Sequence, residues 1–257
     1  LGCRVSAINL EPDGRFPRPP EPIPENLGEL GRLVGESGAD IGMAVDPDVD
    51  RLALVDETGA PIGEDYTLAF AVRAVLSSRL GTSPAAAAVV VNLSTSLVVE
   101  DAARDWGARF VRAPVGEANV ARAIRDEGAI IGGEGNGGVM LPALHIGRDA
   151  PLGVALILQL LTRSGASVSE LVRSSPRYTI VKAKGPRGPE LGPMFDRLRA
   201  RFPEAGVDVR DGLRLSWRDR WLHVRPSGTE PIVRLIAEAP TLAEAEALVA
   251  TGRELLH

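Results

Sequence analysis

Apolar and polar positions in the first part of the chain predict a long loop followed by a compact set of short elements. Residues 11–26 are rich in proline and charge, which predicts an extended loop. Helical spacing of apolar residues begins at 27–34. Two short apolar runs, 41–45 and 52–55, predict strands on either side of a polar loop. A helix is expected at 65–80, before a Gly-Thr-Ser-Pro turn.

Strand and helix patterns alternate through the middle of the chain. A fully apolar run at 87–93 predicts a buried strand. The pattern then predicts a helix, a strand, a helix, two short strands and a helix, at 97–106, 109–111, 118–126, 129–131, 139–141 and 152–162. Alternation of this kind predicts a mainly parallel sheet with helices on both faces.

The order of elements changes after Ser174-Ser175-Pro176. The expected elements are a strand, a helix, three strands and a final helix, at 179–183, 190–201, between 207 and 238, and at 242–256. This order predicts an α+β unit with an antiparallel sheet. The expected fold class is therefore α/β, with mixed, mainly parallel sheets and flanking helices, plus a C-terminal α+β domain. The domain boundaries that follow are 1–78, 79–176 and 177–257.

Composition places the chain among ordinary globular proteins. Of its 257 residues, 44% are hydrophobic and 25% are charged. No apolar run is long enough to span a bilayer and no signal peptide is visible. The single cysteine, Cys3, cannot form an intrachain disulfide, which favours a cytoplasmic location. Because the chain opens at Leu1 in an apolar stretch, we expect it to be a fragment of a longer protein.

Charge is distributed unevenly along the sequence. The net charge of −5 argues against nucleic-acid or anionic-membrane partners. Residues 1–78 carry 6 basic and 14 acidic side chains, whereas residues 177–257 carry 14 basic and 11 acidic ones. An acidic first part suits a bound cation and a basic last part suits a bound phosphate, although solvated surfaces would give the same asymmetry.

The loop between the first two predicted strands places Asp46, Asp48 and Asp50 at alternate positions. Such spacing lets three oxygen ligands converge on one hard cation. Arg51 follows directly and could hold a phosphate brought to that cation. A solvated acidic turn is the alternative interpretation of an isolated Asp-x-Asp-x-Asp motif.

Two other metal-dependent interpretations of this loop are weaker. An EF-hand would also place Glu57 at its twelfth position, but Arg51 stands where that loop needs glycine and Pro47 occupies its second position. We therefore reject it. A haloacid-dehalogenase-type phosphatase would use Asp46 as nucleophile and Asp48 as acid/base. It also needs a later lysine, and the two lysines of the chain lie in another predicted domain.

A glycine-rich loop, Gly132-Gly133-Glu134-Gly135-Asn136-Gly137-Gly138, lies between two predicted strands. Glycines permit tight turns and close approach to a ligand. Glu134 and Asn136 are the side chains there that can hydrogen-bond sugar hydroxyls. The spacing does not match a dinucleotide-binding motif, and a simple hairpin turn is the alternative.

A third loop, Arg225-Pro226-Ser227-Gly228-Thr229-Glu230-Pro231, follows a predicted strand. Two hydroxyls, a glycine and backbone N–H groups in a tight turn form a site suited to anions. Arg225 can add a bidentate contact to phosphate. An ordinary polar turn would use similar residues, and the flanking arginines favour phosphate.

Taken in this order, the three loops resemble those of the α-D-phosphohexomutase family, which includes phosphoglucomutase, phosphomannomutase and phosphoglucosamine mutase. Residues 46–51 resemble its metal loop, 133–138 its sugar-binding loop and 225–231 its phosphate-binding loop. The segment 16–27 and Pro114-Val115-Gly116 also resemble family landmarks. The resemblance covers nearly the whole chain and implies the later part of domain two, then domains three and four.

The resemblance implies an enzyme that moves phosphate between two hydroxyls of a hexose through a phosphoserine and a hexose 1,6-bisphosphate. Asp46, Asp48 and Asp50 would bind Mg²⁺, with Arg51 as a catalytic residue. Glu134 and Asn136 would hold sugar hydroxyls. The non-reacting phosphate of the hexose phosphate would be held by Arg225, Ser227, Gly228 and Thr229.

The sequence departs from the family pattern at three points. Val49 stands where the metal loop usually has a small residue, and Asn136 and Gly138 replace a serine and a histidine in the sugar loop. The Ser-His-Asn core of the nucleophile motif is not among these residues. We therefore expect the chain alone to be inactive and an N-terminal domain to be missing. A non-catalytic sugar-phosphate-binding protein is the alternative.

Overall fold

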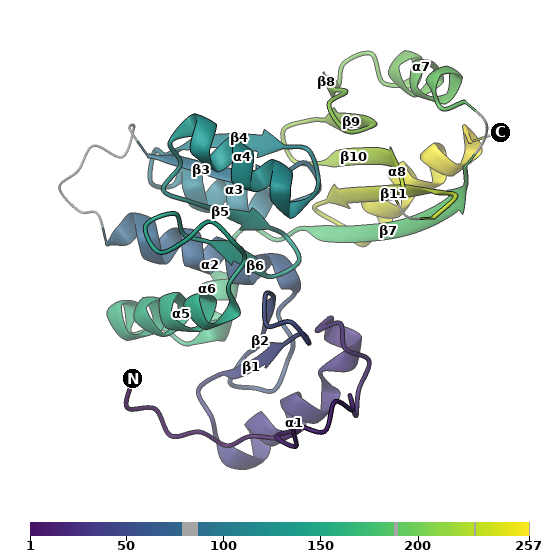
Figure 1. Ribbon diagram of the computed structural model, residues 1–257. Helices are drawn as coiled ribbons and strands as arrows, with labels where there is room; N and C mark the ends of the chain where they lie inside the picture. The colour runs from purple at the N-terminus through teal and green to yellow at the C-terminus, as the bar shows by residue number, and fades with distance from the viewer. Residues whose placement is uncertain (79–86, 188–189, 229, 257) are drawn as a thin grey trace. The chain divides into compact units, whose positions relative to one another are not determined.

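The computed structural model describes residues 1–78, 87–187, 190–228 and 230–256, and its chain forms two compact units (Figure 1). The N-terminal unit comprises 1–91, 98–111 and 116–176. The C-terminal unit comprises 92–97, 112–115 and 177–257. Within the described ranges, no helix is long and apolar enough to cross a membrane.

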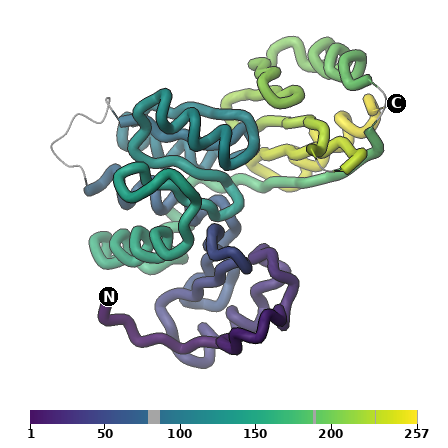
Figure 2. Tube along the Cα trace, in the orientation of Figure 1, coloured from purple at the N-terminus to yellow at the C-terminus, as the bar shows by residue number. Residues whose placement is uncertain are grey.

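The first strands of the N-terminal unit form a hairpin that carries the acidic loop. β1 (Gly42–Val45) and β2 (Leu52–Val55) pair antiparallel, as the two apolar runs predicted. A long irregular segment precedes them and includes a single 3₁₀ turn, η1 (Pro24–Asn26) (Figure 2). α1 (Gly28–Ser37) packs on the hairpin. The small core between them consists of Leu27, Val34, Ala53 and Val55.

A four-stranded sheet forms the rest of the N-terminal unit's framework, in the order β4-β3-β5-β6. Its strands are β3 (Ala88–Asn92), β4 (Arg109–Ala113), β5 (Ile131–Glu134) and β6 (Gly138–Met140). β3 and β5 are parallel, whereas β5 and β6 are antiparallel. β5 lies later in the chain than predicted because Gly132, Gly133 and Glu134 pair within the sheet instead of standing in a loop.

Helices flank this sheet, and they lie close to the predicted positions. They are α2 (Glu64–Ser77), α3 (Leu97–Arg104), α4 (Glu117–Glu127), α5 (Ala150–Ser164) and α6 (Val168–Arg173). α2 and α5 pack against each other. α6 was not predicted, because its six residues are too few to show a helical period. The predicted turn at 81–84 lies outside the described residues.

The C-terminal unit is built on a five-stranded antiparallel sheet in the order β7-β11-β10-β9-β8. Its elements are β7 (Thr179–Pro186), α7 (Gly192–Arg201), β8 (Gly206–Asp208), β9 (Leu213–Ser216), β10 (Trp221–Pro226), β11 (Ile232–Ala239) and α8 (Leu242–Glu254). The prediction of an α+β unit is confirmed, but the prediction of three strands between 207 and 238 was wrong. The described residues of this region form four strands, because a tight turn at Gly212, where φ is +77°, separates β8 from β9.

Two segments from the middle of the chain complete the C-terminal unit, and they are fixed to it by buried polar contacts. The carboxylate of Glu238 accepts hydrogen bonds from Ser96 Oγ, from Leu97 N at 2.8 Å and from Trp221 Nε1 at 2.6 Å. Burial raises the pKa of Glu238, against the lowering effect of these donors. Ser94 Oγ lies 2.8 Å from Nδ1 of the buried His223.

Candidate active site

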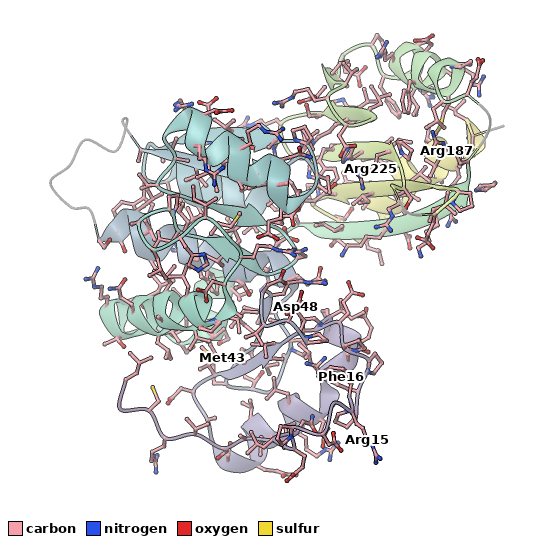
Figure 3. The ribbon with its side chains drawn as sticks, in the orientation of Figure 1. Arg15, Phe16, Met43, Asp48, Arg187 and Arg225 are labelled. Atoms are coloured by element: carbon pink, nitrogen blue, oxygen red, sulfur yellow. The ribbon has the colours of Figure 1, made fainter. Side chains whose placement is uncertain are left out.

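The acidic loop brings three carboxylates together at the end of β1. One oxygen from each of Asp46, Asp48 and Asp50 lies within 4.8 Å of the others. Asp46 is buried and Asp50 is partly buried, whereas Asp48, which is labelled in Figure 3, is exposed. The three residues predicted to share a cation are therefore close enough to do so.

The loop is shaped by the first of these carboxylates. Asp46 Oδ1 accepts hydrogen bonds from the backbone N–H of Asp50 at 3.1 Å and of Arg51 at 3.0 Å. Val49 adopts φ +57°, in the left-handed region that β-branched residues rarely occupy. The departure from the family pattern at this position thus falls where the backbone favours glycine.

Arg51 balances the charge of the loop. Its Nε lies 2.7 Å from Asp46 Oδ2 and 3.6 Å from Asp50 Oδ1, and its Nη1 lies 3.5 Å from Glu21 Oε1. The side chain is 29% exposed, so part of the guanidinium still reaches solvent. Arg51 therefore lies beside the proposed cation ligands.

The pKa values of Asp46 and Asp50 are shifted in opposite directions. Burial raises the pKa of Asp46, but Arg51 and the backbone N–H of Asp50 outweigh it, so the pKa lies below its usual value. For Asp50, burial and the charges of Asp46 and Asp48 raise the pKa despite the nearby Arg148. Crowded negative charge is what a bound cation would neutralise.

Two buried oxygens of the loop test whether a cation fits. Asp46 Oδ2 and Asp50 Oδ1 are buried and accept no hydrogen bond among the described groups, and Arg51 Nε lies near both as their shared ion-pair partner. Buried carboxylate oxygens that lack hydrogen bonds are costly, and Mg²⁺ takes oxygen ligands, keeping several waters. With the exposed Asp48, this donor set fits Mg²⁺.

The glycine-rich loop places its acidic side chain at the end of β5. Glu134 is buried; its Oε1 accepts from Gly116 N at 3.1 Å and its Oε2 from Arg148 Nη1 at 3.1 Å. Asn136 Oδ1 accepts from Gly138 N at 3.3 Å. Both predicted sugar-binding residues are thus held by local contacts.

Glycine is required in this loop by close backbone approach to the hairpin. Gly137 has φ +90°, and a Cβ there would lie 2.4 Å from the carbonyl oxygen of Leu52. The N–H of Leu52 donates to the carbonyl of Gly137 at 3.1 Å. Since Leu52 directly follows Arg51, the glycine-rich loop and the acidic loop are neighbours within the N-terminal unit.

Arg148 is a site residue that the sequence analysis missed. Its guanidinium contacts Asp50 of the acidic loop and Glu134 of the glycine-rich loop, and Glu117 lies 3.4 Å from its Nε. The local signal is weak: a Gly-Arg-Asp sequence directly before a helix. Only the fold shows that residues 98 positions apart meet here.

The phosphate loop lies at the end of β10 in the C-terminal unit. Arg225 Nε donates to Asp211 Oδ2 at 2.9 Å (Figure 3). Ser227 is buried and its N–H donates to Ile232 O at 2.9 Å, while Gly228 is exposed. Thr229 lies outside the described residues. Arg225 stands opposite Arg234 of β11 in the strand register, so two positively charged residues lie on this part of the sheet.

The twelfth residue of the rejected EF-hand lies away from the carboxylates. Glu57 accepts from the N–H and hydroxyl of Ser169. Burial raises the pKa of Glu57, but the hydroxyls of Ser169 and Ser167 lower it to about 2. Glu57 therefore serves to anchor α6, which agrees with the rejection.

Comparison with known proteins assigns most of the chain to one family. Models described as phosphoglucomutase/phosphomannomutase alpha/beta/alpha domain II, alpha/beta/alpha domain III and C-terminal domain match residues 1–59, 63–178 and 195–255. The order of domains agrees with the order of the three loops.

Individual relatives point the same way. A Methanopyrus kandleri protein called probable phosphoglucosamine mutase is 40% identical over 96% of this chain and 55% of its own length. A Thermococcus kodakarensis phosphoglucomutase/phosphomannomutase is 37% identical over 100% of this chain and 56% of its own. A solved Burkholderia thailandensis phosphoglucomutase/phosphomannomutase family protein has TM-score 0.76 and 28% identity, covering 92% of this chain and 51% of that one. The chain spans about half the length of the relatives it matches.

Proposed function

The chain belongs to the α-D-phosphohexomutase family, and from that premise we propose that it supplies the cation-binding, sugar-binding and phosphate-binding parts of a phosphohexomutase. The reaction interconverts hexose 1-phosphate and hexose 6-phosphate through a phosphoserine and a hexose 1,6-bisphosphate. The serine lies outside these residues. The observation that carries the proposal is the group of Asp46, Asp48 and Asp50 beside the glycine-rich loop.

In the proposed function, the acidic loop binds Mg²⁺ through Asp46, Asp48 and Asp50. When bound, Mg²⁺ offsets the negative charge that develops on a transferring phosphoryl group. Arg51 keeps the loop folded through Asp46 and offers its partly exposed guanidinium to the same phosphoryl oxygens. Its contribution is thus both structural and electrostatic.

Glu134 and Asn136 bind sugar hydroxyls through their side-chain oxygens. On Glu134, Oε1 accepts from Gly116 N and Oε2 accepts from Arg148 Nη1. These two contacts fix the orientation in which the carboxylate meets a sugar hydroxyl.

The phosphate loop holds the phosphate that is not reacting. Arg225, with its Nε fixed by Asp211, presents its terminal nitrogens in a set orientation. Ser227, Gly228 and Thr229 add hydroxyl and backbone donors. We assign Thr229 this role from the motif alone.

The proposed substrate class is a hexose phosphate, with glucosamine, glucose and mannose as the candidate sugars. The relatives carry all three names. Titration of the purified chain with each hexose 1-phosphate in turn would rank them. The alternative of a haloacid-dehalogenase-type phosphatase finds little support, because Arg51 and the loop N–H groups hold Asp46, which would have to act as the nucleophile.

Calorimetry tests the binding role directly. The full chain is titrated with glucose 1-phosphate in the presence of Mg²⁺, and with glucose as a control that lacks the phosphate. We expect binding of the phosphate ester only. Equal binding of both sugars, or of neither, would contradict the proposal.

A further inference from the structure

Arg148 lies where three acidic segments meet. It precedes α5, and its side chain is only 15% exposed. Nη2 contacts Asp50 Oδ2, Nη1 lies 3.1 Å from Glu134 Oε2, and Nε lies 3.4 Å from Glu117 Oε2. Each nitrogen of the guanidinium is therefore directed at a different carboxylate.

The path of this side chain is determined by its surroundings. A Cβ at Gly138 would lie 2.3 Å from Arg148 Cδ, so the stem occupies the space that this glycine leaves. Asp149 caps α5 by accepting from Leu152 N at 2.8 Å. Ala150 N donates to Val49 O at 3.2 Å, which joins the start of α5 to the acidic loop.

Arg148 contacts one oxygen of each of two carboxylates, Asp50 and Glu134. Arg148 takes Oδ2 of Asp50, while Oδ1 is buried without a hydrogen-bond donor. On Glu134 it takes Oε2, while Oε1 is held by Gly116 N. A planar guanidinium can fix both carboxylates at once, which a point charge cannot.

We infer that Arg148 is a positioning residue that couples the cation site to the sugar site. A cation that fixes Asp50 also fixes Arg148, and through it Glu134. The second ligand then binds to side chains that are already ordered, so the protein loses less conformational entropy on this binding. By linkage, the sugar phosphate must strengthen cation binding by the same factor. The sugar half of this inference rests on the proposed function.

Hydrogen exchange with the cation alone tests the coupling without any sugar. Mg²⁺ is added to the full chain, and amide exchange is followed in the acidic loop and in residues 132–138. We expect protection in both regions for the unchanged chain. In Arg148→Lys, which keeps the charge but loses the fork, protection should remain in the acidic loop only. Arg148→Met, which keeps the aliphatic stem, is a second variant with the same expected result.

Arg73→Lys is the matched control, because Arg73 is a partly buried arginine of the same unit that donates to Ser175 at 3.3 Å. It should behave like the unchanged chain. Absence of Mg²⁺-dependent protection in residues 132–138 of the unchanged chain would overturn the inference. Persistence of that protection in both Arg148 variants would overturn it too.

Calorimetry then measures the coupling factor itself. Glucose 1-phosphate is titrated with and without saturating Mg²⁺, and we expect its affinity to rise about tenfold in the unchanged chain and less than about twofold in Arg148→Lys. An unchanged factor in Arg148→Lys contradicts the coupling. Failure of the unchanged chain to bind glucose 1-phosphate at all contradicts the proposed function. The exchange experiment uses no sugar, so it still tests whether Arg148 couples the acidic loop to residues 132–138.

Discussion

The acidic loop of the N-terminal unit and the phosphate loop of the C-terminal unit hold their charges in different ways. In the acidic loop, Asp46 and Asp50 are surrounded by Arg51, Arg148 and backbone N–H groups. In the phosphate loop, Arg225 is fixed at Nε by Asp211 while Gly228 is exposed. The first is a network with several cross-links, whereas the second depends on the ion pair between Arg225 and Asp211 and ends in an exposed glycine.

This difference follows from the charge of the expected ligands. Three carboxylates that converge without a cation repel one another, so arginines must hold them together until the cation arrives. A loop for phosphate needs donors that water can satisfy while the ligand is absent. We therefore expect changes in the acidic loop to reduce stability more than changes in the phosphate loop, where the main loss should be in binding.

The largest effect is expected for Asp46→Ala. It removes the acceptor of two loop N–H groups and leaves Arg51 without its nearest carboxylate, at a cost of about 3 kcal/mol in the free energy of unfolding. Cation binding should be lost. Asp48→Ala is the control, because Asp48 is exposed: it should weaken cation binding with little change in stability. Chemical denaturation and calorimetry measure the two effects, and equal destabilisation by both changes would contradict the comparison.

His223 predicts a pH effect confined to the C-terminal unit. Burial lowers its pKa to about 4, from an ordinary value of 6.5, although the hydrogen bond to Asp211 O raises it; the charges of Arg214 and Arg225 lower it further. The unfolded state therefore binds the proton more readily, and stability falls as the pH drops from about 6.5 towards 4. The loss should be about 2.5 kcal/mol at pH 4.5.

The contribution of His223 can be isolated by difference. Free energies of unfolding are compared at pH 7 and pH 4.5 for the unchanged chain and for His223→Leu. The variant should lose the part of the pH dependence that the histidine causes, although it is less stable at pH 7. If both proteins lose the same free energy on acidification, the buried neutral histidine is not responsible.

Arg225→Lys should weaken binding of glucose 1-phosphate by roughly tenfold, nearly as much as Arg225→Ala. The reason is that an ammonium group cannot both contact Asp211 and present a fork to phosphate. NMR titration of the full chain should show shifts at Ser227 and Gly228 that weaken at high salt. A lysine variant with unchanged affinity would mean that Arg225 acts as a simple positive charge.

The smallest effect is expected for Val49→Gly. Relief of the left-handed φ of +57° outweighs the added freedom of the unfolded chain, for a gain of about 0.5 kcal/mol. Val45 is the control, since it has similar exposure but lies in β1. Val45→Gly should instead destabilise by about 1 kcal/mol in thermal unfolding. Destabilisation by both changes would show that the Val49 backbone carries no strain.

Local patterns predicted most of the fold and the loops that carry the site. The hairpin around Asp46, the α/β alternation and the antiparallel C-terminal sheet all follow from apolar periodicity and turn residues. Elements too short to show a periodic pattern were missed, such as α6 and the three-residue β8. Contacts between distant residues were missed as well. Arg148 meets Asp50, and Ser96 meets Glu238, only because the fold brings them together.

One measurement tests most directly the proposal that this chain binds hexose phosphate without transferring the phosphoryl group by itself. Phosphorus NMR of the full chain with Mg²⁺, glucose 1-phosphate and a trace of glucose 1,6-bisphosphate observes both parts at once. We expect broadening or shift of the sugar-phosphate resonances on adding protein, with no glucose 6-phosphate formed. Formation of glucose 6-phosphate that Asp50→Ala abolishes, or resonances that the protein leaves unchanged, would contradict it.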